Sequence, residues 1–271
     1  MTRPLLPVTA DVATRLAGAP LLLMLDVDGT LAPIAPRPED AAVPPDTRRV
    51  VEQLAAHPRV TVAFVSGRAA SDVARLTGVP GAWVVGNHGF EIVRPDGLAL
   101  DPGPLGGTRD AVAGALREIA QVVSATPGAL VEDKRWTASV HFRLADAKAT
   151  PALRAAIDGA AARHGLRVME GKKVFEIRPN EDVNKGTVAL RLTRELANGG
   201  NGAVVYLGDD ATDEDAFASL RASAPAAITA RVTNDDGART AAEFSLEDTN
   251  AVTRFLSWLA AERGVSAPNC P

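Results

Sequence analysis

Short apolar runs alternate along the chain with longer segments whose apolar residues follow a helical spacing. The clearest runs lie at residues 21–25, 60–65, 82–85 and 203–207, and small, polar or acidic residues follow each of them. Apolar runs this short, bounded by turn signals, are typical of strands buried on both faces of a parallel sheet. Because strands and helices alternate, the pattern predicts an α/β protein with a doubly wound, mostly parallel, Rossmann-like core.

The middle of the chain has a different pattern, which predicts an inserted domain. Helical spacing at residues 108–124, and again at 150–164, is followed each time by two β-like runs around a short charged turn. Strands joined by short turns pair in antiparallel fashion, so we expect an inserted α+β unit of the order αββαββ. The expected core is residues 1–105 and 183–271, and the expected cap domain is residues 106–182.

Composition and charge exclude several classes of partner. The 271 residues carry a formal net charge of −4 and include 4% aromatic residues, so the basic surface and aromatic platforms of nucleic-acid-binding proteins are not expected. No apolar run is long enough to span a membrane, and the N-terminus lacks the pattern of a signal peptide. The single cysteine, Cys270, excludes an intrachain disulfide. We expect a cytoplasmic monomer with neither nucleic acid nor a membrane as a partner.

Two carboxylates, Asp26 and Asp28, directly follow the first of the apolar runs. Ligands gather at the carboxyl ends of parallel strands, and residues two apart in an extended chain point to the same side. Two carboxylates on one side repel each other, and a divalent cation such as Mg²⁺ relieves that repulsion. The following Gly29 allows the backbone to turn sharply. An acidic turn without a metal is an equal alternative for these residues taken alone.

Other runs end in polar residues as well. Ser66, Gly67 and Arg68 follow one run, and Asn87 and His88 follow another. An acidic string at residues 209–215 follows a third run, and Lys185 opens a predicted helix before it. Each feature alone has an ordinary structural explanation, such as a turn, a solvated helix start or acidic residues at a helix N-terminus. Their occurrence together, in one order, favours a shared site.

The ordered motifs LDVDGTL, VSGR, GNHG, VEDK with VFEIRP, NKG and GDDATDEDAF resemble those of the haloacid-dehalogenase-like phosphatases. Within that superfamily the chain is most similar to the trehalose-6-phosphate phosphatases, from about residue 21 to 259, and GDDATDEDAF is the most specific string. The resemblance implies Mg²⁺-dependent hydrolysis of trehalose 6-phosphate to trehalose and phosphate, a step of trehalose biosynthesis. The alternatives are a phosphatase for sucrose 6-phosphate or mannosyl-3-phosphoglycerate, and a non-catalytic sensor of phosphosugars.

The resemblance also implies the catalytic residues. Asp26 is implied as the nucleophile that forms an aspartyl-phosphate. Asp28 is implied as the acid that protonates the leaving sugar oxygen, and then as the base that activates water. Ser66 and Lys185 complete the implied set, because they would bind a phosphate oxygen and balance the negative charge of the transferred group.

The Mg²⁺ ligands implied by the resemblance are the Asp26 carboxylate, the Asp28 main-chain carbonyl and Asp209. Asp210 or Asp213 is an alternative third ligand, and both are otherwise expected to support the site.

Recognition of the substrate is expected to be divided between the two domains. A site that contacts only phosphate cannot distinguish sugars, so sugar hydroxyls require further charged partners. The resemblance places sugar contacts at Glu132, Lys134 and Glu176, whose ordinary explanation is a surface ion pair of small energy. The expected substrate-binding residues are, in the core, Gly67, Arg68, Asn87 and His88 and, in the cap, Glu132, Lys134, Glu176 and Arg178.

Overall fold

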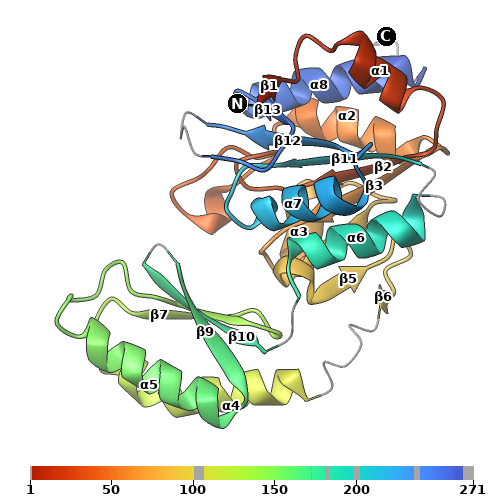
Figure 1. The fold of residues 1–271 in the computed structure, drawn as a ribbon. Helices are drawn as coiled ribbons and strands as arrows, with labels where there is room; N and C mark the ends of the chain where they lie inside the picture. Colours follow the sequence, from red (N-terminus) through yellow and green to blue (C-terminus); the bar gives the residue numbers. More distant parts are fainter. Residues whose placement is uncertain are drawn as a thin grey trace. The chain divides into compact units, whose positions relative to one another are not determined.

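The computed structural model describes residues 2–100, 107–171, 173–180, 183–197, 202–234 and 239–264. The chain divides into two compact units: Met1–Leu100 with Val183–Pro271, and Asp101–Asp182 (Figure 1). Residues 101–106, where the expected core gives way to the expected cap, residues 181–182 at the expected end of the cap, and Cys270 lie outside the described residues. Among the described helices, none has both the length and the apolar character needed to cross a bilayer.

The first unit contains a nine-stranded sheet in the order β1-β13-β12-β11-β2-β3-β4-β5-β6. In this order across the sheet, the seven strands from β1 to β4 are parallel to their neighbours. At the other edge, β4 pairs with β5 and β5 pairs with β6 in antiparallel fashion. The doubly wound α/β class predicted from the sequence is confirmed. The strands are β1 (Arg3–Pro4), β2 (Leu21–Leu25), β3 (Val60–Val65), β4 (Trp83–Gly86), β5 (Glu91–Val93), β6 (Ala99–Leu100), β11 (Ala203–Gly208), β12 (Ile228–Val232) and β13 (Phe244–Leu246).

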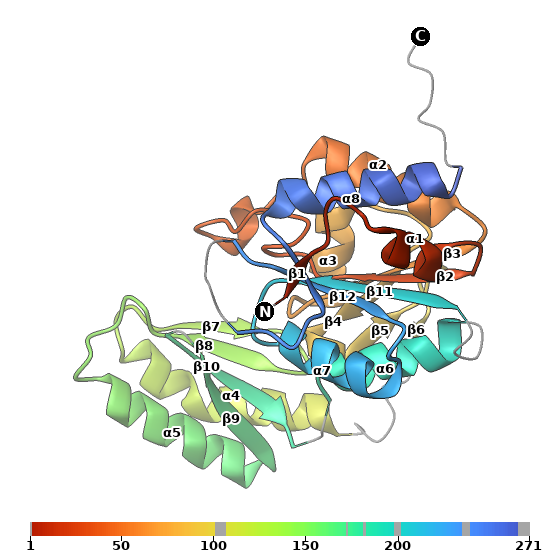
Figure 2. The ribbon, with the colours of Figure 1, turned by 45° about the horizontal axis from the view of Figure 1, so that its top comes forward.

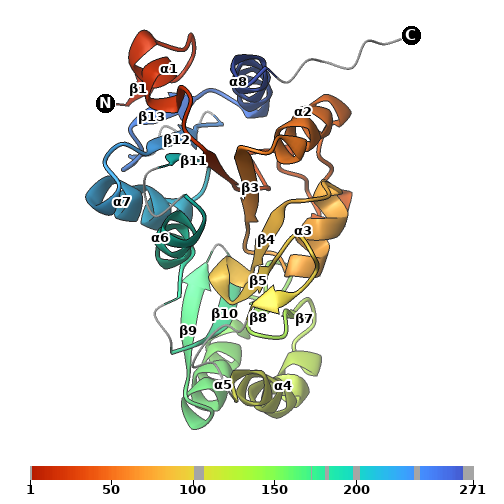
Figure 3. The ribbon, with the colours of Figure 1, turned by 90° about the vertical axis from the view of Figure 1, so that its right-hand side faces the viewer.

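Helices cover both faces of this sheet, as Figure 3 shows. Every residue of β2 is buried, because Leu21, Leu23 and Leu25 pack into one apolar cluster and Leu22 and Met24 pack into another. The first cluster includes residues of α1 (Ala10–Leu16), α2 (Pro45–Ala56), α3 (Ala70–Thr77) and α8 (Thr249–Glu262). The second includes residues of α6 (Lys185–Leu196) and α7 (Asp213–Ser223).

The register of the central strands brings the polar motifs to one edge of the sheet. Leu25 of β2 is paired with Phe64 of β3 and with Leu207 of β11, and Phe64 is paired with Val84 of β4. Since these four strands are parallel, the residues that follow them emerge at the same edge. Two 3-10 turns, η1 (Pro38–Asp40) and η2 (Asn87–Gly89), lie in the loops that follow β2 and β4.

The second unit is a four-stranded antiparallel sheet in the order β7-β8-β10-β9, with α4 and α5 on one face (Figure 2). Its elements are α4 (Thr108–Ser124), β7 (Leu130–Asp133), β8 (Ala138–His141), α5 (Thr150–Arg163), β9 (Leu166–Gly171) and β10 (Val174–Pro179). Val140 and Phe175 pack against the helices. Because side chains alternate along a strand, Glu132, Ser139 and Glu176, which are paired across β7, β8 and β10, lie on the opposite face.

Candidate active site

The Asp26 carboxylate is held by a buried lysine. Asp26 directly follows β2, and its Oδ1 accepts a hydrogen bond from Lys185 Nζ at 2.8 Å. Lys185 is the first residue of α6, and only 1% of its side chain is exposed. A capping box between Asn184 and Thr187 fixes the start of this helix, and therefore the origin of the lysine side chain. The structure thus joins two residues 159 positions apart.

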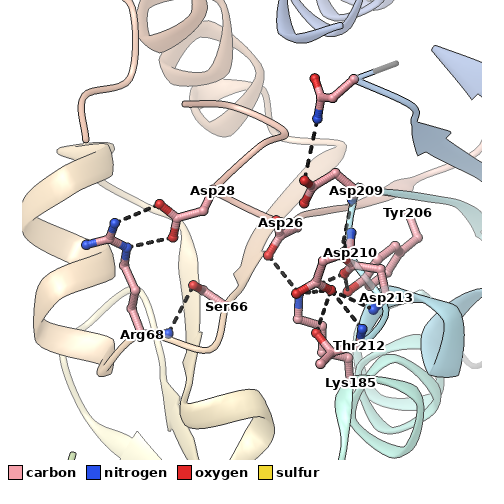
Figure 4. Close-up of polar contacts among 11 residues, drawn as sticks. Asp26, Asp28, Ser66, Arg68, Lys185, Tyr206, Asp209, Asp210, Thr212 and Asp213 are labelled. Carbon is pink, nitrogen blue, oxygen red and sulfur yellow. Dashed lines mark hydrogen bonds and ion pairs between the residues drawn. The ribbon is translucent and has the colours of Figure 1, made fainter. Parts of the chain in front are cut away.

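Asp213 organises the acidic loop that follows β11. Its Oδ1 accepts hydrogen bonds from Lys185 Nζ at 2.8 Å and from the Tyr206 hydroxyl at 2.7 Å. Its Oδ2 accepts the backbone N–H groups of Asp209 and Asp210, each at 3.1 Å. Four donors thus surround one fully buried carboxylate (Figure 4). Two of these hydrogen bonds tie the backbone of the loop to Asp213, and the Asp213 oxygens have little capacity for a further partner.

Asp209 and Asp210 differ in their surroundings. Asp210 Oδ1 accepts three hydrogen bonds, from Thr212 N at 2.8 Å, Thr212 Oγ1 at 2.7 Å and Asp213 N at 3.1 Å. Among the described residues, the Asp209 carboxylate accepts one side-chain hydrogen bond, from Asn234 Nδ2 at 3.5 Å. A Cβ added at Gly29 would lie 1.9 Å from Asp209 Oδ2, so this close approach requires glycine.

The acidic cluster could hold a metal ion. Asp26, Asp209 and Asp213 each offer an oxygen atom, and these atoms lie within 4.8 Å of one another. A donor set made only of carboxylate oxygens suits a hard divalent cation. Because the Asp213 oxygens already accept four hydrogen bonds, Asp26 and Asp209 have the larger remaining capacity to bind a cation.

The pKa values of the clustered carboxylates also indicate an excess of negative charge in this cluster. Burial raises the pKa of Asp26, and the neighbouring carboxylates add to the effect while Lys185 opposes it. Burial raises the pKa of Asp209 to about 7 and that of Asp213 to about 6, with Asp210 contributing to both. Burial alone would lower the pKa of Lys185, but Asp213 and Asp26 raise it above its ordinary value. One buried ammonium therefore faces several carboxylates, an imbalance that a bound cation would relieve.

Asp28 points away from this cluster. Arg68 donates from Nε to Asp28 Oδ2 at 2.6 Å and from Nη2 to Asp28 Oδ1 at 2.7 Å, and Figure 4 shows Asp28 directed toward Arg68 rather than toward Asp26. The expectation that the Asp26 and Asp28 side chains share one side is wrong. Strand β2 ends at Leu25, and the Val27 carbonyl accepts the N–H groups of Leu31 and Ala32, so a turn begins between Asp26 and Asp28 and strand alternation does not extend to Asp28.

Two loops combine to place the remaining core residues. The loop after β4 donates from Asn87 N to Arg68 O at 2.7 Å and from His88 N to Ser66 O at 2.9 Å. Both donors have left-handed φ values, +50° for Asn87 and +57° for His88, a strain often found at functional sites. The Ser66 hydroxyl accepts the Arg68 N–H at 3.2 Å. A Cβ at Gly67 would lie 2.6 Å from the His88 ring, so these two loops are closely packed.

The expected sugar-binding residues of the second unit form ion pairs. Glu132 Oε2 lies 3.6 Å from Lys134 Nζ and 3.1 Å from His141 Nε2. The hydrogen bond from His141, together with the charge of Lys134, lowers the pKa of Glu132. Glu176 is paired with Arg178. Within this unit the structure therefore shows a charged face, and Glu132 and Lys134 form the ion pair that their ordinary explanation predicts.

The family model described as trehalose-phosphatase matches residues 24–250. This span contains the acidic cluster around Asp26 and the ion-paired residues of the second unit. The chain belongs to the trehalose-phosphatase family. The resemblance read from the motifs is thereby confirmed.

Members of the trehalose-phosphatase family are similar over most of the chain. Trehalose-phosphate phosphatases of Mycobacterium tuberculosis and Mycobacterium avium are each 37% identical to it, over 240 and 258 residues. These matches cover 88% and 93% of this chain, and 61% and 66% of the two relatives. The chain therefore spans less than two thirds of the length of these curated relatives. A solved structure of Aspergillus fumigatus trehalose-6-phosphate phosphatase superimposes with a TM-score of 0.70 at 28% identity, covering 98% of this chain and 100% of that chain.

Two residues of this site, Tyr206 and Asn234, were missed by sequence reasoning. Tyr206 lies in the apolar run of β11, where nothing in the pattern separates it from a core residue, yet its hydroxyl contacts Asp213. Asn234 follows β12 in a polar stretch, and its side chain reaches both Gly29 and Asp209. An asparagine in a turn is common and carries no functional signal by itself.

Proposed function

We propose that the protein is a Mg²⁺-dependent phosphatase that hydrolyses trehalose 6-phosphate to trehalose and inorganic phosphate. The observation that carries the proposal is the buried network in which Lys185 binds both Asp26 and Asp213, beside Asp209, at the carboxyl edge of the sheet. Burying a lysine with this many carboxylates costs desolvation free energy, and groups perturbed in this way cluster at functional sites. Membership of the trehalose-phosphatase family supports the same activity.

Asp26 is proposed as the nucleophile. A carboxylate oxygen attacks phosphorus, the bond from phosphorus to the sugar oxygen breaks, and an aspartyl-phosphate remains on the enzyme. Water then attacks phosphorus and regenerates the carboxylate. Lys185 holds Oδ1 at 2.8 Å, which orients the side chain and leaves Oδ2 available for attack. The lysine charge also offsets the negative charge that accumulates during transfer.

Asp28 is proposed as the acid in the first step and the base in the second. It would give a proton to the leaving sugar oxygen and later take a proton from the attacking water. In the present arrangement Arg68 occupies both Asp28 oxygens. Each oxygen keeps a second lone-pair site, so Arg68 can orient Asp28 while one oxygen exchanges a proton with the leaving group or with water.

The proposed Mg²⁺ ligands are the carboxylates of Asp26 and Asp209 and the main-chain carbonyl of Asp28. A bound divalent cation supplies Lewis-acid neutralisation of phosphate charge. Asp213 and Asp210 support the site, because their hydrogen bonds fix the loop that carries Asp209. Asp213 is unsuited to direct ligation because both of its oxygens are already occupied.

The phosphate group is assigned to the two joined loops, through Ser66, Gly67, Arg68, Asn87 and His88. The sugar is assigned to the charged face of the second unit, through Glu132, Lys134, Glu176 and Arg178. Carboxylates bind hydroxyl donors, and ammonium or guanidinium groups bind hydroxyl oxygens, so the set is suited to a polyhydroxylated ligand. The ion pairs within it keep these side chains oriented while no sugar is bound.

A substrate panel tests the proposal. Phosphate release is measured with trehalose 6-phosphate, sucrose 6-phosphate, mannosyl-3-phosphoglycerate and glucose 6-phosphate under identical conditions with Mg²⁺. The highest kcat/KM is expected for trehalose 6-phosphate. A higher kcat/KM for another sugar phosphate would show that this compound, and not trehalose 6-phosphate, is the preferred substrate. If none of the four is hydrolysed, the result would favour the alternative of a non-catalytic sensor of phosphosugars. The cytoplasmic location and the monomeric state stay predictions.

A further inference from the structure

Asn234 connects two parts of the core that carry proposed metal ligands. It lies two residues beyond β12 and has a left-handed φ of +39°, a conformation that asparagine tolerates better than most residues. Its main-chain N–H donates to Glu247 O at 3.1 Å, which fixes the backbone. Its side-chain Nδ2 donates to Gly29 O at 2.9 Å and faces Asp209 Oδ2 at 3.5 Å. One amide group therefore contacts both the loop after β2 and the loop after β11.

The Asp209 carboxylate lies close to both this amide and the backbone at Gly29. Its Oδ2 occupies the space that a side chain at Gly29 would fill, with 1.9 Å to the position of an added Cβ. The carboxylates of Asp210 and Asp213 lie nearby and repel it. Among the described residues, Asn234 provides the one side-chain hydrogen bond that this carboxylate accepts. Without that donor, repulsion would favour rotation of Asp209 away from the cluster.

We propose that Asn234 is a positioning residue for the cation site: it anchors to the Gly29 carbonyl and holds the Asp209 carboxylate toward the Asp26 loop. This inference rests on the part of the proposed function that makes Asp209 a metal ligand. Groups that orient a metal-binding carboxylate are commonly worth about 10- to 100-fold in metal affinity. Asn234 is expected to act on cation binding without contacting the substrate.

Direct measurement of cation binding, with no substrate present, tests the inference. Mn²⁺ affinity is measured by electron paramagnetic resonance, and Mg²⁺ affinity by competition, for wild type, Asn234→Gly and Asn234→Gln. Glycine accepts the positive φ but removes the amide, whereas glutamine keeps a donor on a longer side chain. Asn250→Ala is the matched control, since Asn250 Nδ2 also faces a carboxylate oxygen, Asp248 Oδ2 at 3.4 Å, on the exposed start of α8. Unfolding midpoints without metal are recorded for each protein.

The expected result is a loss of about tenfold or more in affinity for Asn234→Gly, a smaller loss for Asn234→Gln and none for Asn250→Ala. A purely structural role predicts instead that Asn234→Gly lowers the metal-free midpoint while affinity stays within about twofold of wild type, and that result would overturn the inference. Wild type that binds no divalent cation would contradict both the inference and the proposed metal site. Wild type that binds the cation but hydrolyses no sugar phosphate would contradict the proposed activity alone.

Discussion

Arg68 binds both carboxylate oxygens of Asp28, with donor–acceptor distances of 2.6 Å from Nε and 2.7 Å from Nη2. The same guanidinium donates from Nη1 to Pro38 O at 3.0 Å, which ties it to the loop after β2. Two-point pairing of this kind fixes the plane as well as the position of a carboxylate. Arg68 therefore sets the orientation in which Asp28 is proposed to serve as an acid.

Arg68→Lys tests this role. Lysine keeps the positive charge but cannot form the two parallel hydrogen bonds. Losing charged hydrogen bonds worth about 1.5–3 kcal/mol is expected to lower kcat/KM for trehalose 6-phosphate by roughly 10- to 150-fold. Steady-state phosphate release provides the measurement. Arg75→Lys is the control, because Arg75 forms an exposed ion pair with Asp72 in α3. Equal kinetics for Arg68→Lys and wild type would contradict the assignment.

The charged face of the second unit is expected to bind the sugar of the substrate and not its phosphate group. Separate changes of Glu132, Lys134 and Glu176 to alanine should each lower kcat/KM for trehalose 6-phosphate by roughly 10- to 150-fold, the cost of one charged hydrogen bond. Hydrolysis of p-nitrophenyl phosphate, which carries no sugar, should change much less. Both substrates are measured on the same preparations.

Glu170→Ala is the matched control for these variants. Glu170 lies on β9 of the same sheet and pairs with Arg154 at 2.9 Å, outside the proposed sugar-binding set. It should leave both activities unchanged. If the three variants lose both activities to the same degree, or lose neither, the face does not select the sugar.

The acidic cluster predicts how stability and cation binding depend on pH. Because the pKa of Asp209 is raised to about 7 and that of Asp213 to about 6, the folded protein binds more protons than the unfolded chain between about pH 4 and pH 7. The metal-free protein should therefore lose stability as pH rises through this window. A cation replaces those protons, so its affinity should rise over the same window.

Thermal unfolding with and without Mg²⁺ checks this prediction. The stabilisation by a fixed excess of Mg²⁺ should be larger at pH 8 than at pH 5, because binding raises the unfolding midpoint in proportion to the logarithm of affinity. An excess of chelator should abolish turnover at pH 8, and added Mg²⁺ should restore it. Stabilisation that is equal at the two pH values, or full activity in chelator, would contradict a metal site built from these carboxylates.

Tyr206 allows a further test because it is the only tyrosine of the chain. Burial raises its pKa well above the ordinary value, and Asp213 adds to the shift. Its ultraviolet ionisation signal should therefore appear only when alkali unfolds the protein. A reversible tyrosine titration near the ordinary pKa of about 10, with the fold intact by circular dichroism, would show that the hydroxyl is not held against Asp213.

The sequence predicted those parts of the fold that have a strong local signal. The run at Leu21–Leu25 was identified to the residue, because a continuous apolar run of five residues between turn signals is typical of a buried strand and too short for a helix. The short outer strands β1, β13, β5 and β6 were missed, since strands of two or three residues show no measurable alternation. Their pairing is decided by contacts with neighbours far away in the chain.

The candidate site was predictable as a set of residues but not as a geometry. Asp26, Lys185, Asp209 and Asp213 meet as the motifs suggested, although α6 and β2 are separated by the whole second unit. The direction of Asp28 was wrong because it depends on a turn rather than on strand alternation. The contact of Asn234 with Gly29 spans 205 positions, and no local pattern encodes it.

The most direct test of the central claim compares phosphate release from trehalose 6-phosphate by wild type and by Asp26→Asn at the same Mg²⁺ concentration. An amide cannot form the aspartyl-phosphate, and a neutral side chain suits the buried position, where burial already raises the pKa of Asp26. The account predicts an intact fold by circular dichroism, rapid turnover by wild type and a loss of more than about 10³-fold in kcat for the variant. A folded Asp26→Asn protein that retains a substantial fraction of the wild-type rate would contradict it.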